Sequence, residues 1–355
     1  MDNRLRVGVV GCGIGRSHIQ AYRNLPEMFE VVAICDLDKD KAREVASQNG
    51  IPNVLTDLDV LCGMGDIDVI DVCTPSYLHS EHVLLALAGG KYVVCEKPVA
   101  GSLQAVDDLL RAERDAGKRV MPIYQNRFGH GLQKLRLLID EGLAGKAYLT
   151  TVETAWRRRQ AYYDVPWRGR WATELGGPLV TLAIHAHDVL TYVIGPAQRV
   201  FAHAATRVNP IETEDCLGAV LEMADGSLAT LAVTTGSADE ISRLRFCFEG
   251  LTAESTTAPY ACTRDPWRFT ADSPEDEQRV AETLGRFDPL PEGFEGQFYR
   301  FYHAIQQGSD PPVTLGDARA SLELITALYY SVETGEPVPL PIGTDHPRYV
   351  SWRPE

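Results

Sequence analysis

The chain has 355 residues, and at roughly 100–200 residues per domain this length predicts two domains. Apolar residues make up 45% and charged residues 23%, which is ordinary for a globular protein and excludes a disordered or fibrous chain. The 34 basic and 49 acidic residues leave a formal net charge of −15. Because an acidic surface repels a phosphate backbone, we expect no nucleic-acid partner.

We expect neither a membrane span nor an export signal. A lipid-spanning helix needs about 20 consecutive apolar residues, whereas the best run, residues 69–73, is short and interrupted by Asp71. The N-terminus leads straight into a short apolar run. Of the eight cysteines no pair has CxxC spacing, and Cys35, Cys73 and Cys95 lie in or beside apolar runs, as buried thiols do. We therefore expect free cysteines, no metal, no membrane contact and a cytoplasmic location.

Short apolar runs alternate with helical patterns over the first 125 residues. The runs are Leu5–Val10, Val31–Cys35, Val69–Cys73, Tyr92–Cys95 and Val120–Tyr124. They are rich in β-branched residues, which is typical of strands buried on both faces of a parallel sheet. One intervening helix is predicted to begin after Ser102, as N-cap, and to stop at Gly117. This order predicts an α/β domain over residues 1–125, with βαβ units in a doubly wound sheet.

The pattern changes over residues 126–355, which we predict to form a second, α+β domain. A helix with leucines at 132, 135 and 138 precedes stretches that alternate between apolar and polar residues. These stretches are Ala147–Ala155, Val200–Thr206, Leu217–Met223, Leu228–Thr234 and Leu244–Glu249. Residues 224–227 form a hairpin signal, so a mostly antiparallel sheet with one wetter face is predicted.

Two later segments of the second domain carry their own signals. Thr314 and Asp317 form a capping box that predicts the start of a late helix, which Gly335 and Pro337 close. Residues 252–296 are rich in Thr, Pro, Asp and Glu, and we interpret them as an irregular insertion.

A glycine motif, Gly11-Cys12-Gly13-Ile14-Gly15, directly follows the first strand and opens the first helix. Glycines there let the backbone approach a pyrophosphate, which the helix N-terminus attracts, although the third glycine comes one residue earlier than in GxGxxG. Asp36 ends the second strand 21 residues after Gly15, where a carboxylate can accept hydrogen bonds from ribose hydroxyls. An N-cap for the next helix is the alternative role of Asp36. An acid here repels a 2′-phosphate, and Leu37 offers no arginine for one, so NAD is predicted rather than NADP.

Further motifs carry a resemblance to a known family. They are Asp71-Val72-Cys73-Thr74-Pro75, His79, Cys95-Glu96-Lys97-Pro98, Tyr124-Gln125-Asn126-Arg127-Phe128, Gly176-Gly177 and His185-Ala186-His187-Asp188. Through these motifs the chain resembles the glucose–fructose oxidoreductase/inositol dehydrogenase/MocA (Gfo/Idh/MocA) family. The resemblance extends to the last predicted helix, at residues 315–335.

The resemblance implies a Rossmann domain followed by a large open antiparallel sheet, which shapes the substrate pocket and often forms the oligomer interface. A homodimer or homotetramer is therefore expected. It also implies NAD(P) chemistry on sugars, cyclitols or related secondary alcohols. Carried onto this sequence, the family's motifs place further cofactor contacts at Thr74, Pro75, His79, Glu96, Lys97 and Asn126.

Lys97 is the candidate stabiliser of the substrate oxygen. It follows a buried strand at the sheet edge where ligands bind, and Pro98 pushes it toward an extended conformation. A cation there can hydrogen-bond the substrate hydroxyl and favour the alkoxide character that hydride loss requires. A solvated, idle lysine is the alternative. We also expect a cis bond between Lys97 and Pro98.

His185 is the candidate general base, because alcohol oxidation removes a proton as well as a hydride. It lies on a helix predicted over residues 179–194, where a satisfied core histidine is the alternative, and His187 is interpreted as structural. Asp188 could contact substrate, fix the ring of His185 or cap the backbone. Inositol dehydrogenase-like members carry an aspartate one turn earlier, where this chain has Thr181. The full Lys-Asp-His triad is therefore absent, which weakens inositol as the substrate.

A basic, aromatic block runs through Trp156–Arg159 and Trp167–Trp171. Indole faces stack on sugar rings, and guanidinium groups hold hydroxyls or carboxylates. A loop at a subunit interface is the alternative, and a nucleic-acid patch is disfavoured by the acidic remainder. The predicted substrate-binding residues are Lys97, Arg127, Arg158, Trp167, Arg168, Trp171, Thr181, His185 and Asp188.

Three functional hypotheses follow. The first is an NAD-dependent dehydrogenase that oxidises a secondary hydroxyl of a sugar, glycoside or cyclitol. The second keeps the same site but uses NAD transiently, in a redox-neutral lyase or hydrolase. The third, a non-catalytic NAD sensor or scaffold, would be expected to lose Lys97 or His185, and both are present.

Overall fold

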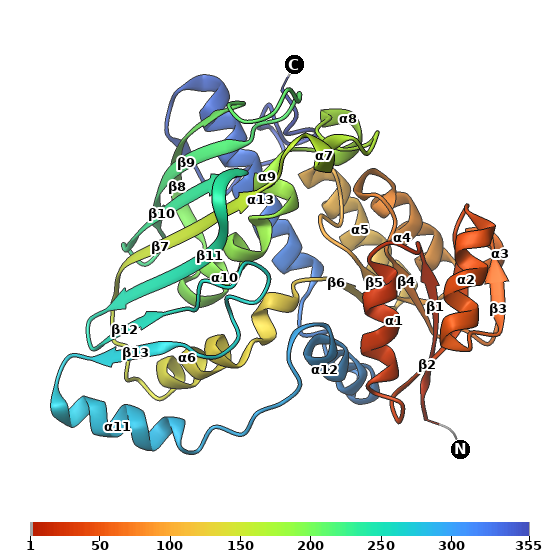
Figure 1. The fold of residues 1–355 in the computed structure, drawn as a ribbon, viewed down its shortest axis with the longest axis horizontal. Helices are drawn as coiled ribbons and strands as arrows, with labels where there is room; N and C mark the ends of the chain where they lie inside the picture. The colour runs from red at the N-terminus through yellow and green to blue at the C-terminus, as the bar shows by residue number, and fades with distance from the viewer. Residues whose placement is uncertain (1–2, 355) are drawn as a thin grey trace. The chain divides into compact units, whose positions relative to one another are not determined.

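The computed structural model describes residues 3–354 and forms two compact units (Figure 1). The first unit contains the chain up to Ile123 together with Phe294–Arg319, and the second contains Tyr124–Gly293 and the chain from Ala320 onward. The division into functional domains at residues 125 and 126 stays a prediction. The segment Phe294–Arg319, assigned from sequence to the second domain, nevertheless belongs to the first unit.

The first unit is built on a six-stranded parallel sheet in the order β3-β2-β1-β4-β5-β6. Its strands are β1 (Leu5–Val10), β2 (Phe29–Cys35), β3 (Asn53–Leu55), β4 (Val69–Val72), β5 (Tyr92–Cys95) and β6 (Val120–Pro122). This order, which reverses its direction of winding between β1 and β4, confirms the predicted Rossmann topology. Strand β3 was not predicted, because its three residues are only half-buried and form no apolar run.

Helices connect these strands as the sequence predicted. They are α1 (Gly15–Arg23), α2 (Lys39–Asn49), α3 (Leu58–Gly63), α4 (His79–Ala88) and α5 (Leu103–Ala116), with a 3-10 turn η1 (Ser76–Leu78) before α4. The hydroxyl of Ser102 accepts the N–H of Ala105, and Gly117 adopts the left-handed conformation, so both predicted ends of α5 are confirmed.

A late helix, α12 (Gly293–Gln307), completes the first unit. Its Phe298 is fully buried and stacks on Tyr22 of α1 with ring centroids 4.2 Å apart. Tyr302 meets Phe29 of β2 edge-on. The aromatic residues 294, 298 and 302 recur every four residues, so they form one face of α12, and this face packs on the α1 side of the sheet. Local sequence patterns do not indicate this long-range contact.

The second unit contains an eight-stranded sheet in the order β13-β12-β11-β7-β10-β9-β8-β14. Its strands are β7 (Ala147–Arg157), β8 (Ala197–Ala205), β9 (Cys216–Met223), β10 (Leu228–Thr234), β11 (Gly236–Phe248), β12 (Leu251–Glu254), β13 (Arg268–Ala271) and β14 (Val338–Pro339). All neighbours are antiparallel except β7 and β10. Alternate residues of β9 are buried, and residues 224–227 connect β9 to β10, as predicted.

Helices cover one face of this sheet (Figure 1). The helices of the second unit are α6 (His130–Asp140), α7 (Gln160–Tyr163), α8 (Trp171–Glu174), α9 (Pro178–Thr181), α10 (Ile184–Ile194), α11 (Pro274–Leu284) and most of α13 (Leu315–Thr334), with the 3-10 turn η2 (Gln125–Phe128). Ser331 of α13 accepts the N–H of Ala202 in β8. Thr314 and Asp317 form the predicted capping box at the start of α13.

Two predictions for the second unit were wrong. The helix predicted over residues 179–194 is broken at Leu182 and Ala183 into α9 and α10, so Thr181 does not lie on the same helix as His185. The segment 252–296 is not irregular, since it holds most of β12, all of β13 and α11. Helix α11 is a polar surface helix capped by Ser273, and its acidic composition hid its periodicity.

All eight cysteines are free, as predicted. Within residues 3–354, no single helix has the length and hydropathy of a membrane span. The bent pair Trp171–Thr181 and Ile184–Ile194 meets that criterion by length and composition alone.

Candidate functional site

The glycine motif forms a tight turn between β1 and α1. Gly11 has φ +99°, and a Cβ there would lie 2.5 Å from the carbonyl oxygen of Cys73, so only glycine fits. A Cβ at Gly15 would lie 3.0 Å from Val9. At Gly13, in contrast, a Cβ would meet no atom of the described residues within 4 Å. Gly11 and Gly15 thus permit close packing, while Gly13 leaves space for a ligand beside the N-terminus of α1.

Asp36 lies beside this turn, at the end of β2. Its Oδ2 accepts the N–H of Cys12 at 2.7 Å, and its Oδ1 accepts the N–H of Asp38 at 2.9 Å. Burial acts to raise the pKa of Asp36, but these hydrogen bonds outweigh it and lower the pKa below its ordinary value. The N-cap of α2 is Asp38, so the alternative role predicted for Asp36 was wrong. The turn, the helix N-terminus and this carboxylate fit an adenine dinucleotide.

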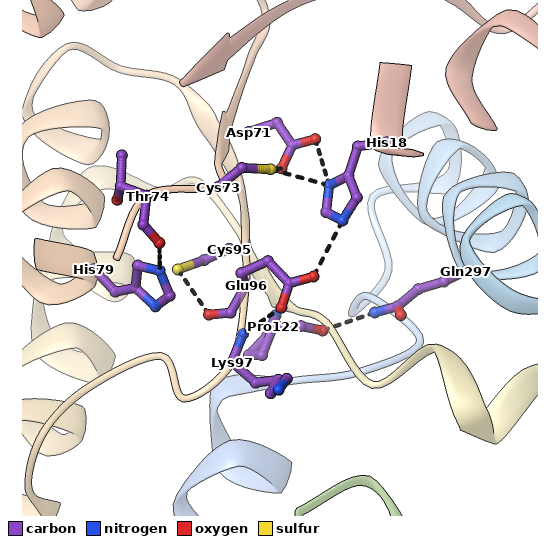
Figure 2. Close-up of polar contacts among 10 residues, drawn as sticks. All are labelled: His18, Asp71, Cys73, Thr74, His79, Cys95, Glu96, Lys97, Pro122 and Gln297. Carbon is purple, nitrogen blue, oxygen red and sulfur yellow. Dashed lines mark hydrogen bonds and ion pairs between the residues drawn. The ribbon is translucent and has the colours of Figure 1, made fainter. Parts of the chain in front are cut away.

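The loops that follow β4 and β5 are joined by His79 (Figure 2). Its ring nitrogens lie 2.7 Å from the carbonyl oxygen of Thr74 and 2.8 Å from that of Pro98. Thr74 also contacts the ring of His82 at 3.1 Å, and Pro75 lies at the start of the same loop. Because His79 is buried between two backbone carbonyls, we expect it to position these loops rather than to contact a cofactor.

Lys97 lies at the carboxyl end of β5, as predicted, and is half-buried. Its peptide bond to Pro98 is cis, which confirms the expectation from sequence. The backbone N–H of Lys97 donates to Oε2 of Glu96 at 3.1 Å. The side chain of Glu96 thus fixes the backbone of the Glu-Lys-Pro element at Lys97.

A buried polar cluster, which sequence reasoning missed, lies next to Glu96 (Figure 2). His18 of α1 and Asp71 of β4 are fully buried, and their side chains meet at 2.9 Å. The other ring nitrogen of His18 lies 3.2 Å from Oε1 of Glu96, and Sγ of Cys73 lies 3.3 Å from the first. The one signal in the sequence was Asp71, an acid within a buried apolar strand.

His185 lies on α10 in the second unit and is half-buried. Tyr124 meets its ring edge-on, with centroids 6.2 Å apart. Thr181, on α9, donates its hydroxyl to the carbonyl oxygen of Gly177 at 3.1 Å. Asn126 lies on η2 and is half-buried. His187 is fully buried, and burial lowers its pKa to about 3, which supports its structural interpretation.

The structure pairs two predicted substrate-binding residues with each other. Arg127 and Asp188 are buried and form a two-pronged ion pair, with Nε to Oδ2 at 2.8 Å and Nη2 to Oδ1 at 2.6 Å. Ser321 donates to the same carboxylate at 3.3 Å. Both charged groups face each other out of solvent, so the pair ties η2 to α10, and their contact with a substrate stays a prediction.

The basic, aromatic block forms a stacked cluster in the second unit. Arg158 pairs with Glu240 and with the hydroxyl of Tyr260. The guanidinium of Arg168 lies 3.6 Å from the ring centroid of Tyr162 and 5.0 Å from that of Trp167. Trp171 is tied elsewhere, because its indole N–H donates to the carbonyl oxygen of Glu212 at 3.1 Å. Arg168 and Trp167 thus remain the better candidates for a sugar contact.

Comparison with known proteins agrees with this geometry. Residues 5–124 match the model of an oxidoreductase family with an NAD-binding Rossmann fold, and residues 132–253 match the GFO/IDH/MocA C-terminal domain. D-Glucoside 3-dehydrogenase of Escherichia coli (strain K12) is 28% identical over 364 residues, which cover 95% of this chain and 97% of that protein. 2,7-Anhydro-N-acetylneuraminate hydratase of the same strain is 29% identical over 64% of this chain and 61% of that protein.

Solved structures show the same fold. The WlbA dehydrogenase from Bordetella pertussis, in complex with NADH and UDP-GlcNAcA, superimposes with a TM-score of 0.84 at 28% identity. That alignment covers 96% of this chain and 100% of the other. The prediction of an NAD-binding Rossmann domain is confirmed.

Proposed function

Since this chain belongs to the Gfo/Idh/MocA family of NAD-binding oxidoreductases, we propose that it oxidises a secondary hydroxyl of a sugar, glycoside or cyclitol. One observation carries the proposal. A glycine turn with open space at Gly13, the carboxylate of Asp36 and the side chain of Lys97 follow β1, β2 and β5 of one parallel sheet. Ligands of such sheets bind at the carboxyl ends of the strands.

The residues divide the chemistry between them. NAD, when bound, supplies the acceptor for the hydride. The turn at Gly13 and the N-terminus of α1 bind the pyrophosphate, and Asp36 accepts hydrogen bonds from the ribose. Lys97 donates a hydrogen bond to the substrate oxygen and stabilises its developing negative charge. His185 takes the hydroxyl proton on a ring nitrogen.

Substrate choice is proposed to come from the second unit. Trp167 and Arg168 offer an indole face and a guanidinium group, which suit the C–H face and the hydroxyls of a sugar ring. Thr181 takes the place of the aspartate found in inositol dehydrogenase-like members, so a glucoside is favoured over inositol as substrate. The D-glucoside 3-dehydrogenase relative supports the same class.

The assembly is proposed to be a cytoplasmic homodimer or homotetramer that associates through the second sheet. Val220 of β9 and Leu228 of β10 are exposed on one face of that sheet, where a partner would cover them. Light scattering measures the mass directly, and a monomer at micromolar concentration contradicts this part of the proposal.

The test is a substrate panel read at the nicotinamide absorbance. Methyl glucosides, D-glucose, levoglucosan and myo-inositol are each offered with NAD and with NADP. We expect NADH formation with a glucoside or free sugar, and in Lys97→Ala a fall in kcat of about 10²-fold or more at unchanged NADH affinity. Full activity in Lys97→Ala contradicts the role of Lys97.

A redox-neutral reaction is the second candidate, favoured by the likeness to a hydratase. In that case the sugar is oxidised, an adjacent bond is eliminated, and the hydride returns from the cofactor to the sugar. Product then accumulates without net NADH, so chromatography and absorbance measured on the same samples separate the two reactions. NAD binding with no product of either kind indicates a sensor or scaffold.

A further inference from the structure

His18 is placed between two carboxylates in the first unit (Figure 2). Its Nδ1 lies 2.9 Å from Oδ2 of Asp71, and its Nε2 lies 3.2 Å from Oε1 of Glu96. All three residues are buried. An ionised carboxylate is only an acceptor, so each ring nitrogen must donate to satisfy both contacts. Only the protonated imidazole carries two N–H groups.

The surroundings of His18 support this charge. Opposite charges inside a protein favour the charged form of each other, and two neighbouring buried carboxylates without a cation would repel. Burial alone lowers the pKa of His18, but Asp71, Cys73 and their hydrogen bonds raise it well above the ordinary value. The rings of Phe294 and Phe298 of α12 also face His18, with ring centroids at 4.5 and 5.4 Å from that of the imidazole.

The contact to Glu96 links this cluster to the proposed catalytic lysine. One oxygen of Glu96 accepts from His18, and the other accepts the backbone N–H of Lys97. The geometry points to His18 as a buried positioning residue: held as an imidazolium between Asp71 and Glu96, it fixes Glu96, which in turn fixes the backbone of Lys97. The functional part of this inference rests on the proposed role of Lys97, whereas the charge of His18 does not.

A metal ion is the competing occupant of the cluster, because ligand atoms of His18, Asp71 and Cys73 all lie within 4.8 Å of one another. Two observations favour the protonated ring. The contacts of the ring nitrogens already have hydrogen-bond length, and burial raises the pKa of Cys73 well above its ordinary value, which favours the thiol over the thiolate that binds metals.

The first experiment needs no substrate. The chain has nine histidines, so an imidazole spectrum of protein labelled with ¹⁵N-histidine is tractable, and the loss of one signal in His18→Gln assigns His18. We expect His18 to show two N–H groups from about pH 6 to about pH 9, while the equally buried His187 stays neutral throughout. A neutral His18 ring in this range, or a stoichiometric metal by elemental analysis, overturns the inference.

A matched pair of variants tests the link to Lys97. The amide of His18→Gln can replace the Nε2 donor toward Glu96, whereas that of His18→Asn can replace only the Nδ1 donor toward Asp71. The chain has seven lysines, so the Lys97 backbone amide is readily followed in ¹⁵N-lysine protein. Its hydrogen exchange should be faster by about tenfold in His18→Asn and closer to wild type in His18→Gln. The amide of Lys91, bonded to Ala86, is the internal control.

Measurements of activity are the last part of the test. His18→Asn should lower kcat by about tenfold at unchanged NADH affinity, and it should add nothing in a Lys97→Ala background, because both changes remove the same contribution. An additive loss, or unchanged exchange at Lys97, means that His18 does not act through Lys97 and overturns the inference. If Lys97→Ala is fully active, the proposed function of Lys97 fails, while the ring spectrum and the exchange data still decide whether the positioning contact exists.

Discussion

The two units hold their proposed catalytic residues with different buried charges. In the first unit, the cation beside Lys97 is an imidazolium that depends on its two carboxylates, Asp71 and Glu96. In the second, the helix of His185 is tied by Arg127 and Asp188, and an arginine keeps its charge at any working pH. The first network can therefore lose its charge if a carboxylate is neutralised, whereas the second can only be broken by removing a partner.

The buried histidines of the two units also differ in charge. His18 and His187 are both fully excluded from solvent. Burial lowers the pKa of both rings, but Asp71 and Cys73 raise that of His18 well above its ordinary value. The pKa of His187 falls to about 3, because its ring has no hydrogen-bond partner among the described residues. Burial alone predicts a neutral ring for both histidines, which is wrong for His18. The groups that contact the ring decide its charge.

Removing the proposed base of the second unit should have the largest effect. His185→Ala should lower kcat/KM by about 10²–10⁴-fold, the usual span for a general base. In the wild type, kcat/KM should rise with pH through one ionisation, because only the neutral ring accepts a proton. The pH profiles of the two proteins check this, with the exposed His203→Ala as control. An unchanged dependence on pH in His185→Ala means that another group takes the proton.

Breaking the ion pair of the second unit should cost most in stability. Asp188→Ala leaves the charge of Arg127 buried without its carboxylate and should destabilise by about 3–5 kcal/mol. Urea unfolding measures this. The double variant Arg127→Met with Asp188→Ala removes the stranded charge and should recover part of the loss. A loss below about 1 kcal/mol in the single variant would mean that the pair is solvated.

Local patterns predicted most of the fold, and their failures have physical causes. The strands with apolar or alternating runs, β1, β2 and β4 to β11, were found, as were the caps at Ser102, Gly117 and Thr314. Helix α11 was missed because its segment is rich in Thr, Pro, Asp and Glu, a composition typical of loops, although Val280 and Thr283 give the helix a buried side. The placement of α12 on α1 depends on contacts between residues far apart in the sequence, which no local window contains.

The local geometry of the candidate site could be predicted from neighbouring residues. The glycine turn, Asp36 and the cis bond before Pro98 lie where expected. Arg127 and Asp188 were singled out as substrate contacts, but their pairing joins residues 61 positions apart and could not be seen in the sequence. His18 gave no signal of its own, because a histidine on the inner face of a helix looks like any other core residue.

Another buried carboxyl group, that of Glu214 in the second unit, extends the comparison between the units. Glu214 accepts the N–H groups of Gly177 and Leu179 at 3.1 Å each and the hydroxyl of Tyr329 at 2.9 Å, at the start of α9. Burial raises its pKa to about 7 from an ordinary 4.5. The folded protein therefore binds this proton more tightly than the unfolded chain. Stability from Glu214 is fully present below about pH 4.5 and is lost as the pH rises through about 7.

This loss amounts to at most about 3 kcal/mol. Urea midpoints of the wild type and of Glu214→Gln, measured from pH 5 to pH 8, separate the contribution of Glu214 to stability from that of other titrating groups. Because the neutral amide carries no such ionisation, the wild type should lose stability relative to Glu214→Gln as the pH rises. Parallel curves would mean that Glu214 is ionised throughout this range.

The smallest expected effect concerns Asp36, whose carboxylate, unlike Glu214, has a lowered pKa and stays ionised at working pH. That charge repels a 2′-phosphate, so the wild type should bind NADH more tightly than NADPH, and Asp36→Ala should narrow the preference by about tenfold. Asp36→Ala also removes the acceptor for the N–H of Cys12, whereas the amide oxygen of Asp36→Asn can retain it. If charge sets the choice, both variants gain affinity for NADPH equally. If the shape of the glycine turn sets it, only Asp36→Ala loses affinity for NADH, and fluorescence titration of both nucleotides separates the two causes.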